Sequence, residues 1–196
     1  DFLNQDPDRL LEMRLNFYLR GLNKTEDPKA ENELVGPNGE IVGRVKNGRP
    51  KFFPDYYVIP MSLDKDNDAQ EAFNMIDYFK RNGVLVKELK EDTGTYKKGD
   101  LVIDMSQAKR GYANHILYKG SNESAWAAMY AELLVNFPDM RGFKSEPVFA
   151  DGLFNGKLGE VTTTRATRTS EIDPKAPYYV IANTSASAVK AVNQAI

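Results

Sequence analysis

The first helix that the hydrophobic pattern predicts lies close to the start of the chain. Its start is marked by Asp6-Pro7, because Asp caps free amides and Pro tolerates the first helical turn. Four apolar residues recur at helical spacing after it: Leu11, Leu15, Tyr18 and Leu22. The pattern therefore predicts a helix that runs to about Leu22 and buries this face.

A strand, a helix and a second strand follow in the middle of the chain. The run Tyr56-Tyr57-Val58-Ile59 is short and apolar, which is typical of a buried strand. Asp68 and Glu71 match a capping box that starts a helix, and Asn82-Gly83 ends it. Residues 84–89 are expected to form the second strand. Because such a crossover makes parallel neighbours, we expect an α/β fold, with an open, mostly parallel sheet flanked by helices.

The pattern continues with further elements after this unit. Residues 96–105, turned at Lys98-Gly99, have the composition of another strand. Helical spacing returns over 108–117 and again over 122–136, and Pro138 is expected to stop the second of these helices. A short extended stretch is expected at Val148-Phe149.

The two ends of the chain are less regular. Asn38-Gly39 and Asn47-Gly48 are hairpin cues that follow a polar linker. Tyr178-Tyr179-Val180-Ile181 repeats the string of the first strand and precedes a helix. We therefore divide the chain into three parts: an N-terminal helix, linker and hairpin (1–55), an α/β accessory domain (56–150), and a connector with a final strand and helix that is expected to be truncated (151–196).

Composition removes several classes of function. The 196 residues include no Cys and one His, and their formal net charge is −2. The chain therefore has no disulfide, thiolate nucleophile or Cys-based metal site, and it lacks the basic excess of a protein that binds nucleic acid without sequence preference. No apolar run approaches the roughly 20 residues of a spanning helix, so we expect no transmembrane segment. The first residue is Asp, which suggests an excised segment whose location in the cell the sequence does not give.

Two patterns resemble metal sites and fail at defined positions. Asp64, Asp66 and Asp68 have the spacing of a calcium loop, but Ala69 stands where its glycine belongs, and a capping loop explains the acids. The single His115 would need Glu at position 118 to form a zinc-peptidase pair, and Tyr118 stands there. We therefore expect no metal site in this chain and a surface or partly buried His115.

The residues that precede the helix over 108–117 are the candidate ligand-binding group. Ser106 follows a strand as a nucleophile elbow would, but the glycines of the elbow are missing, so a capping role is the simpler reading. Lys109 and Arg110 lie near the helix start, where free amides and the macrodipole favour an anion. Ser106, Lys109 and Arg110 are thus the predicted anion or carboxylate site, and a surface dibasic pair is the alternative.

Ordered short strings between residues 56 and 143 carry a resemblance to a known family. They are Tyr57-Val58-Ile59, Gly83-Val84, Lys98-Gly99-Asp100-Leu101-Val102-Ile103-Asp104-Met105, Gln107-Ala108-Lys109-Arg110-Gly111 and Asn136-Phe137-Pro138-Asp139-Met140-Arg141-Gly142-Phe143. The chain resembles the segment after the catalytic domain in bacterial zinc carboxypeptidases of the carboxypeptidase A type, from about residue 1 to 149. The resemblance implies a fold similar to class I glutamine amidotransferases, here with a small β-hairpin insertion.

The resemblance implies a non-catalytic role. The zinc ligands and the general base of the family have no counterpart here, and the amidotransferase nucleophile would require Cys. The chain is therefore expected to be an accessory domain of a metallopeptidase that uses zinc to release C-terminal residues from peptides. Its partners would be the catalytic domain of the same polypeptide and, through it, the peptide substrate, and a secreted or cell-surface parent is expected.

Two other functions remain open from the sequence. An independent α/β module would bind a small ligand beyond the strand ends, near residues 62–66 or 106–110. A serine hydrolase would use Ser106 with His115 as its base.

Overall fold

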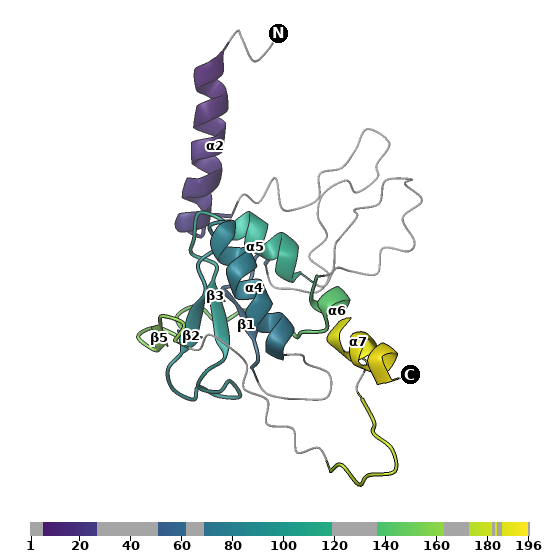
Figure 1. Cartoon of the computed structure of the whole chain (residues 1–196). Coiled ribbons are helices and arrows are strands. Elements are labelled where there is room, and N and C mark those ends of the chain that lie inside the picture. The colour runs from purple at the N-terminus through teal and green to yellow at the C-terminus, as the bar shows by residue number, and fades with distance from the viewer. Residues whose placement is uncertain are drawn as a thin grey trace, which may run out of the picture.

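The computed structural model describes residues 6–26, 51–61, 69–118, 137–162, 173–181, 183 and 186–195. Within these ranges the elements follow one another along the chain (Figure 1) as α2 (Pro7–Leu22), β1 (Tyr56–Ile59), α4 (Ala69–Arg81), β2 (Lys87–Leu89), β3 (Leu101–Asp104), α5 (Arg110–Leu117), α6 (Phe137–Arg141), β4 (Glu146–Val148), β5 (Leu158–Gly159) and α7 (Ala186–Ala195). The two expected hairpins and the expected helix over 122–136 lie outside the described residues.

The sheet is a small antiparallel one, so the expectation of an open, mostly parallel sheet is wrong. Its five strands lie in the order β4-β1-β3-β2-β5, and every neighbouring pair is antiparallel. The strands β1 and β2 run in the same direction, since each is antiparallel to β3, but β3 lies between them. The crossover through α4 therefore fixes the direction of β2 without making it the neighbour of β1, as in a split βαβ unit. The amidotransferase-like topology is overturned with it.

The helix α4 begins and ends close to where the sequence places it. At its C-terminus Gly83 has a φ of +74°, a left-handed conformation that favours glycine. The Val84 amide donates to the Phe79 carbonyl at 2.9 Å and the Gly83 amide donates to the Lys80 carbonyl at 3.1 Å. These two bonds form a Schellman motif, which confirms the predicted end at Asn82-Gly83.

Both faces of the sheet are buried. One face packs against α4 and α5 (Figure 1), and its core includes Tyr57, Ile59, Leu101, Ile103, Met75, Phe79, Ile116 and Leu117. The other face carries the alternate side chains Tyr56, Val58, Leu89, Val102 and Val148, which pack around Phe154. The ring of Phe154 meets Tyr56 at a centroid distance of 5.0 Å and Tyr96 at 5.5 Å. The core therefore includes residues beyond position 150.

The helix α2 forms as predicted, but the burial expected of its apolar face is wrong. The Asp6 side chain accepts a hydrogen bond from the Arg9 amide at 3.0 Å, which confirms the predicted cap. Leu11 and Leu15 are 65% and 57% exposed, and Gly21 is the buried residue of this helix. Figure 1 shows the cause: α2 projects away from the sheet and meets the rest of the described chain at its C-terminal end.

Pro138 lies in the described part of α6, and its predicted role as the end of a helix over 122–136 lies outside the described residues.

The strand expected near the end of the chain is wrong. Tyr178-Tyr179-Val180-Ile181 is no strand: these residues have no regular structure and are exposed. No residue of α7 is buried, and an open hollow of about 240 Å³ lies between this helix and Ile181. An isolated strand needs a neighbour to pair with, and none lies beside this segment among the described residues.

The packing of Phe154 gives a test of the second core. Replacing Phe154 by Ala should lower the free energy of unfolding by about 3–5 kcal/mol, because it leaves a cavity between Tyr56 and Tyr96. Urea unfolding measures this loss. Met140→Ala, at a residue that is 74% exposed, is the matched control and should change stability by less than about 0.5 kcal/mol. Equal effects of the two substitutions would contradict the packing.

Candidate functional site at the base of helix α2

The structure brings Ser106, Lys109 and Arg110 together where α2 ends. Ser106 Oγ donates to the Leu22 carbonyl at 2.9 Å, and so satisfies one of the free carbonyls of the last helical turn. Arg110 is 6% exposed; its Nη2 donates to the Thr25 carbonyl at 2.7 Å, and its guanidinium lies 4.2 Å from the centroid of the Phe53 ring. These contacts tie α5 and the loop before it to the end of α2.

Lys109 contacts the same helix one turn earlier. Its Nζ lies 5.2 Å from the centroid of the Tyr18 ring, a cation–π geometry. On the other side, Arg14 Nε donates to the Tyr18 hydroxyl at 3.3 Å. The pKa of Tyr18 is lowered, first by the hydrogen bond with Arg14 and then by Lys109, because both cations favour the phenolate.

Two glycines allow α2 to approach so closely. A Cβ on Gly21 would overlap the Gln107 carbonyl oxygen and lie 3.2 Å from that of Ala108. A Cβ on Gly111 would lie 2.8 Å from Phe17 Cζ. Because backbone oxygens cannot swing aside as side chains do, Gly21 is required where the helix crosses this loop.

Lys24 turns the chain after α2 and reaches into a group of carboxylates that we call the acidic cluster: Asp55, Asp104 and Asp151. Its φ of 50° is rare for a residue with a side chain and ends the helix in the left-handed conformation. Lys24 Nζ lies 2.7 Å from Asp151 Oδ1 and 4.0 Å from an oxygen of each of the other two. The same Nζ lies 5.2 Å from the centroid of the Tyr56 ring. The strained turn is therefore held by ion pairs.

The pKa shifts follow from this arrangement. Burial alone would lower the pKa of Lys24, but the hydrogen bond with Asp151 and the charges of Asp104 and Asp151 outweigh it, so that pKa is raised. The pKa of Asp151 is lowered, chiefly by its hydrogen bond with Lys24. The pKa of Tyr56 is raised, first by burial and then by the charge of Asp104.

The contacts define what this group of residues does within the chain. Ser106, Lys109 and Arg110 all interact with α2 or the turn after it, so the cations point to a helix end and an aromatic ring. Binding of an anion by them stays a prediction. Ser106 gives its proton to a carbonyl, and His115 lies in the last turn of α5, at the end of that helix farther from Ser106. The arrangement favours anchoring of a helix over nucleophilic chemistry.

The structure describes only one of the two sequence patterns that resemble metal sites. Asp64, Asp66 and Asp68 lie outside the described residues. His115 is half-buried in α5. Within the part of the chain that the structure describes, no group of three or more His, Asp or Glu residues is placed to hold a metal ion.

The sequence reasoning missed Gly21, Lys24 and the acidic cluster. A glycine in the last turn of an amphipathic helix is unusual and could have indicated a close crossing. The cluster had no such signal, because its three carboxylates are 49 and 47 positions apart along the chain and only the folded sheet brings them together.

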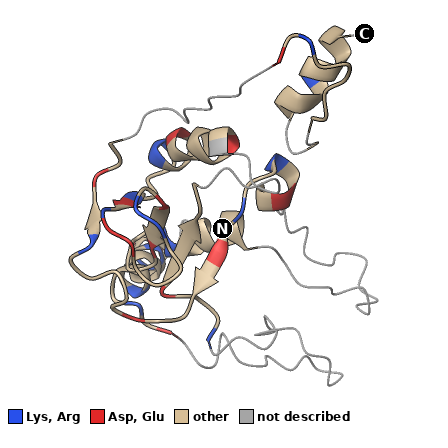
Figure 2. Cartoon of the chain, turned by 90° about the horizontal axis from the view of Figure 1, so that it is seen from below, with Lys and Arg blue, Asp and Glu red and all other residues tan. Residues whose placement is uncertain are grey.

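Comparison with protein families, curated proteins and solved structures gave no match for this chain. None of the helices described is long and apolar enough to cross a bilayer. Figure 2 shows basic and acidic residues interspersed along the described ribbon, in keeping with the net charge of −2.

Replacing Gly21 by Ala tests the close crossing. In an unconstrained helix this change stabilises by up to about 1 kcal/mol. Here we expect a net loss of about 1–2 kcal/mol in the free energy of unfolding, because the new Cβ meets two carbonyl oxygens. Asn16→Ala, on the exposed middle of α2, is the control and should be neutral or slightly stabilising in urea unfolding. A gain in stability for Gly21→Ala would contradict the crossing.

Acid titration tests the ion pair of Lys24 with Asp151. Because the pKa of Asp151 is lowered in the folded chain, the pair stabilises above the ordinary Asp pKa of about 3.9 and this contribution disappears as pH falls through the folded value. Wild type should therefore be more stable than Asp151→Asn at pH 7 and equal to it near pH 2, in urea unfolding at low salt. In a Lys24→Met background the Asp151→Asn change should have a much smaller effect at pH 7, because only the weaker interactions of Asp151 with Lys51 and the Gly152 backbone remain. An undiminished effect would refute the pairing.

Proposed function

We propose that this chain is a non-catalytic accessory domain of a zinc metallocarboxypeptidase. The observation that carries the proposal is where the family-like strings lie. They form β1, the C-terminal cap of α4, β3, the start of α5, and α6, which pack together as the sheet and its helical cover. The resemblance thus falls on one contiguous folded unit, whose fold is the antiparallel one described above.

The base of α2 supports a scaffolding role. The polar side chains that were the best candidates for chemistry interact with the carbonyls and the ring of α2 and its following turn. Among the described residues His115 belongs to no group of three or more His, Asp or Glu placed to hold a metal ion. In the proposed enzyme the zinc would be held by the catalytic domain. In this role the chain would hold α2 in a fixed position relative to the sheet.

The alternative of a ligand-binding α/β module has less support. One of its two expected pockets, near residues 62–66, lies outside the described residues. At the other, near residues 106–110, the end of α2 contacts the residues that would bind the ligand.

Zinc content and peptidase activity test the proposal. The complete reading frame that contains this segment should encode a His-x-x-Glu pair with a later His, and the purified product should hold one zinc and release C-terminal residues from peptides. The 196-residue chain alone should do neither. A reading frame without these ligands, or a chain that binds zinc and cleaves peptides unaided, would contradict the proposal.

A further inference from the structure

The sequence contains four Asn-Gly pairs, which are the dipeptides most open to spontaneous deamidation. In such a pair the backbone nitrogen of the glycine can attack the Asn carboxamide, because glycine has no side chain to hinder the approach. The structure describes two of the pairs, Asn82-Gly83 and Asn155-Gly156. Asn38-Gly39 and Asn47-Gly48 lie outside the described residues. The two described pairs have the same reactive groups, so their surroundings decide how fast each one reacts.

Asn155 and Gly156 are the two central residues of an exposed turn. The Lys157 amide donates to the Phe154 carbonyl at 3.0 Å and closes this turn around them. Within the described part of the chain, neither the Gly156 amide nor the Asn155 carboxamide has a hydrogen-bond partner. A Cβ on Gly156 would meet nothing within 4 Å, so the space beside the attacking nitrogen is open. Both reacting groups are therefore free to approach each other in water.

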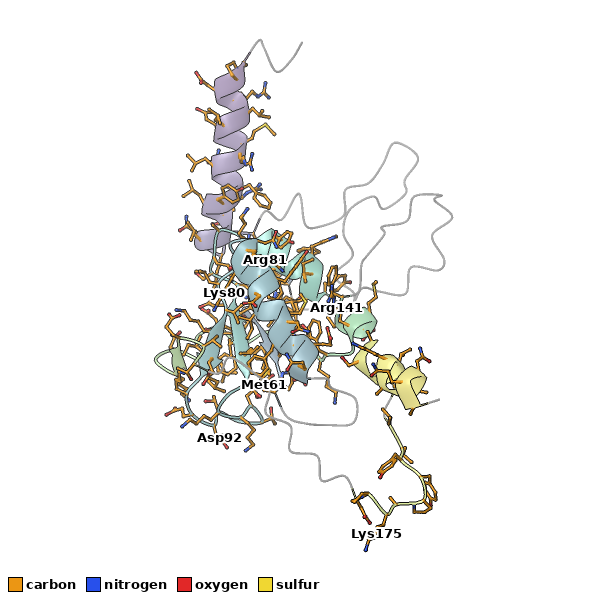
Figure 3. All side chains as sticks on the ribbon, in the orientation of Figure 1. Met61, Lys80, Arg81, Asp92, Arg141 and Lys175 are labelled. Carbon is orange, nitrogen blue, oxygen red and sulfur yellow. The ribbon has the colours of Figure 1, made fainter. Side chains whose placement is uncertain are left out.

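The other pair, Asn82-Gly83, is held in place at the end of α4. It directly follows Arg81, which Figure 3 labels at the C-terminal end of this helix. Asn82 Nδ2 donates to the Tyr78 carbonyl at 2.8 Å, and the Gly83 amide donates to the Lys80 carbonyl at 3.1 Å. This pair has to break both hydrogen bonds before it can react, whereas the pair in the exposed turn has to break neither.

We propose that Asn155 is a deamidation site of the folded chain and that Asn82 is protected. The Gly156 nitrogen attacks Asn155 Cγ, the bond from Cγ to Nδ2 breaks, and the amide proton leaves with Nδ2 as ammonia. One water then adds to either carbonyl of the resulting five-membered imide. The products are aspartate and isoaspartate, and the main chain of isoaspartate is one carbon longer. The reaction needs only this chain and water, so it does not depend on the proposed function.

The longer main chain would lie between two contacts that hold the second face of the sheet. On one side of the turn, Phe154 packs between Tyr56 and Tyr96. On the other side, the Lys157 carbonyl accepts from the Lys90 amide at 2.9 Å, next to β5. An added carbon between these contacts changes the geometry of the bond that closes the turn, and hydrogen bonds weaken steeply when misaligned. Isoaspartate at position 155 would therefore loosen the packing of Phe154.

Peptide mapping by mass spectrometry tests the site after incubation of the 196-residue chain at mildly alkaline pH. In the folded chain Asn155 should deamidate at least about tenfold faster than Asn82, because two hydrogen bonds protect Asn82. In guanidinium chloride, which removes these bonds, the two rates should become similar. Equal rates in the folded chain would overturn the proposal. So would an Asn155 that stays intact over a period in which the denatured chain is modified.

Two variants test the loosening of Phe154. Asn155→Gln keeps the carboxamide but would have to form a larger ring, so the same incubation should leave its urea midpoint unchanged. Asn155→Asp carries the added charge without the longer main chain, and it should unfold near the midpoint of fresh wild type, since residue 155 is exposed. Incubated wild type should unfold at lower urea than both. Equal losses in wild type and Asn155→Gln, or no loss in a wild-type sample that contains isoaspartate at position 155, would refute the loosening.

Discussion

The pairing of β1 with β3 is the constraint on which the rest of the structure depends. The two strands pair over four residues each, from Tyr56 opposite Asp104 to Ile59 opposite Leu101. Apart from Asp104, these residues are at most 2% exposed, because helices cover one face of the sheet and the segment around Phe154 covers the other. A strand buried on both faces allows no slip in register, since a slip of one residue would exchange the two sets of side chains.

That register also places the base of α2. The chain leaves β3 at Asp104 and reaches α5 through a loop in which the Gln107 side chain accepts from the Leu85 amide at 2.9 Å and Ser106 meets the end of α2. Asp55, next to β1, and Asp104, at the end of β3, therefore lie at the same end of the sheet, and both approach Lys24. The anchoring of α2 is thus a consequence of strand pairing, and the large apolar residues of α2 stay exposed on a unit whose two core clusters form without them.

The sequence predicted local structure well and long-range arrangement poorly, for physical reasons. The cap at Asp6, the strand at Tyr56–Ile59 and the helix end at Gly83 depend on neighbouring residues, and the structure confirms them. The crossover through α4 indicated the direction of β2 correctly. It could not indicate that β3 would insert between β1 and β2, because that choice depends on pairing energies between distant segments.

At the base of α2, too, local sequence patterns did not predict contacts between distant residues. The apolar spacing of α2 predicted a buried face that the structure leaves exposed, since periodicity records which side of a helix is apolar and not whether anything covers it. Ser106, Lys109 and Arg110 were singled out together, and the structure does place them in one region. Their partners in α2 and the turn after it lie more than 80 positions away along the chain, beyond the reach of any local pattern.

The most direct test of the account is whether α2 keeps a fixed position relative to the sheet. Because the chain has no Cys, spin labels can be attached at Glu12→Cys, an exposed residue of α2, and at Lys98→Cys, in the turn before β3. Pulsed electron paramagnetic resonance then measures the distance between the two labels in the 196-residue chain. The account predicts a single narrow distance distribution. A broad distribution, with α2 swinging freely about its base, would contradict it.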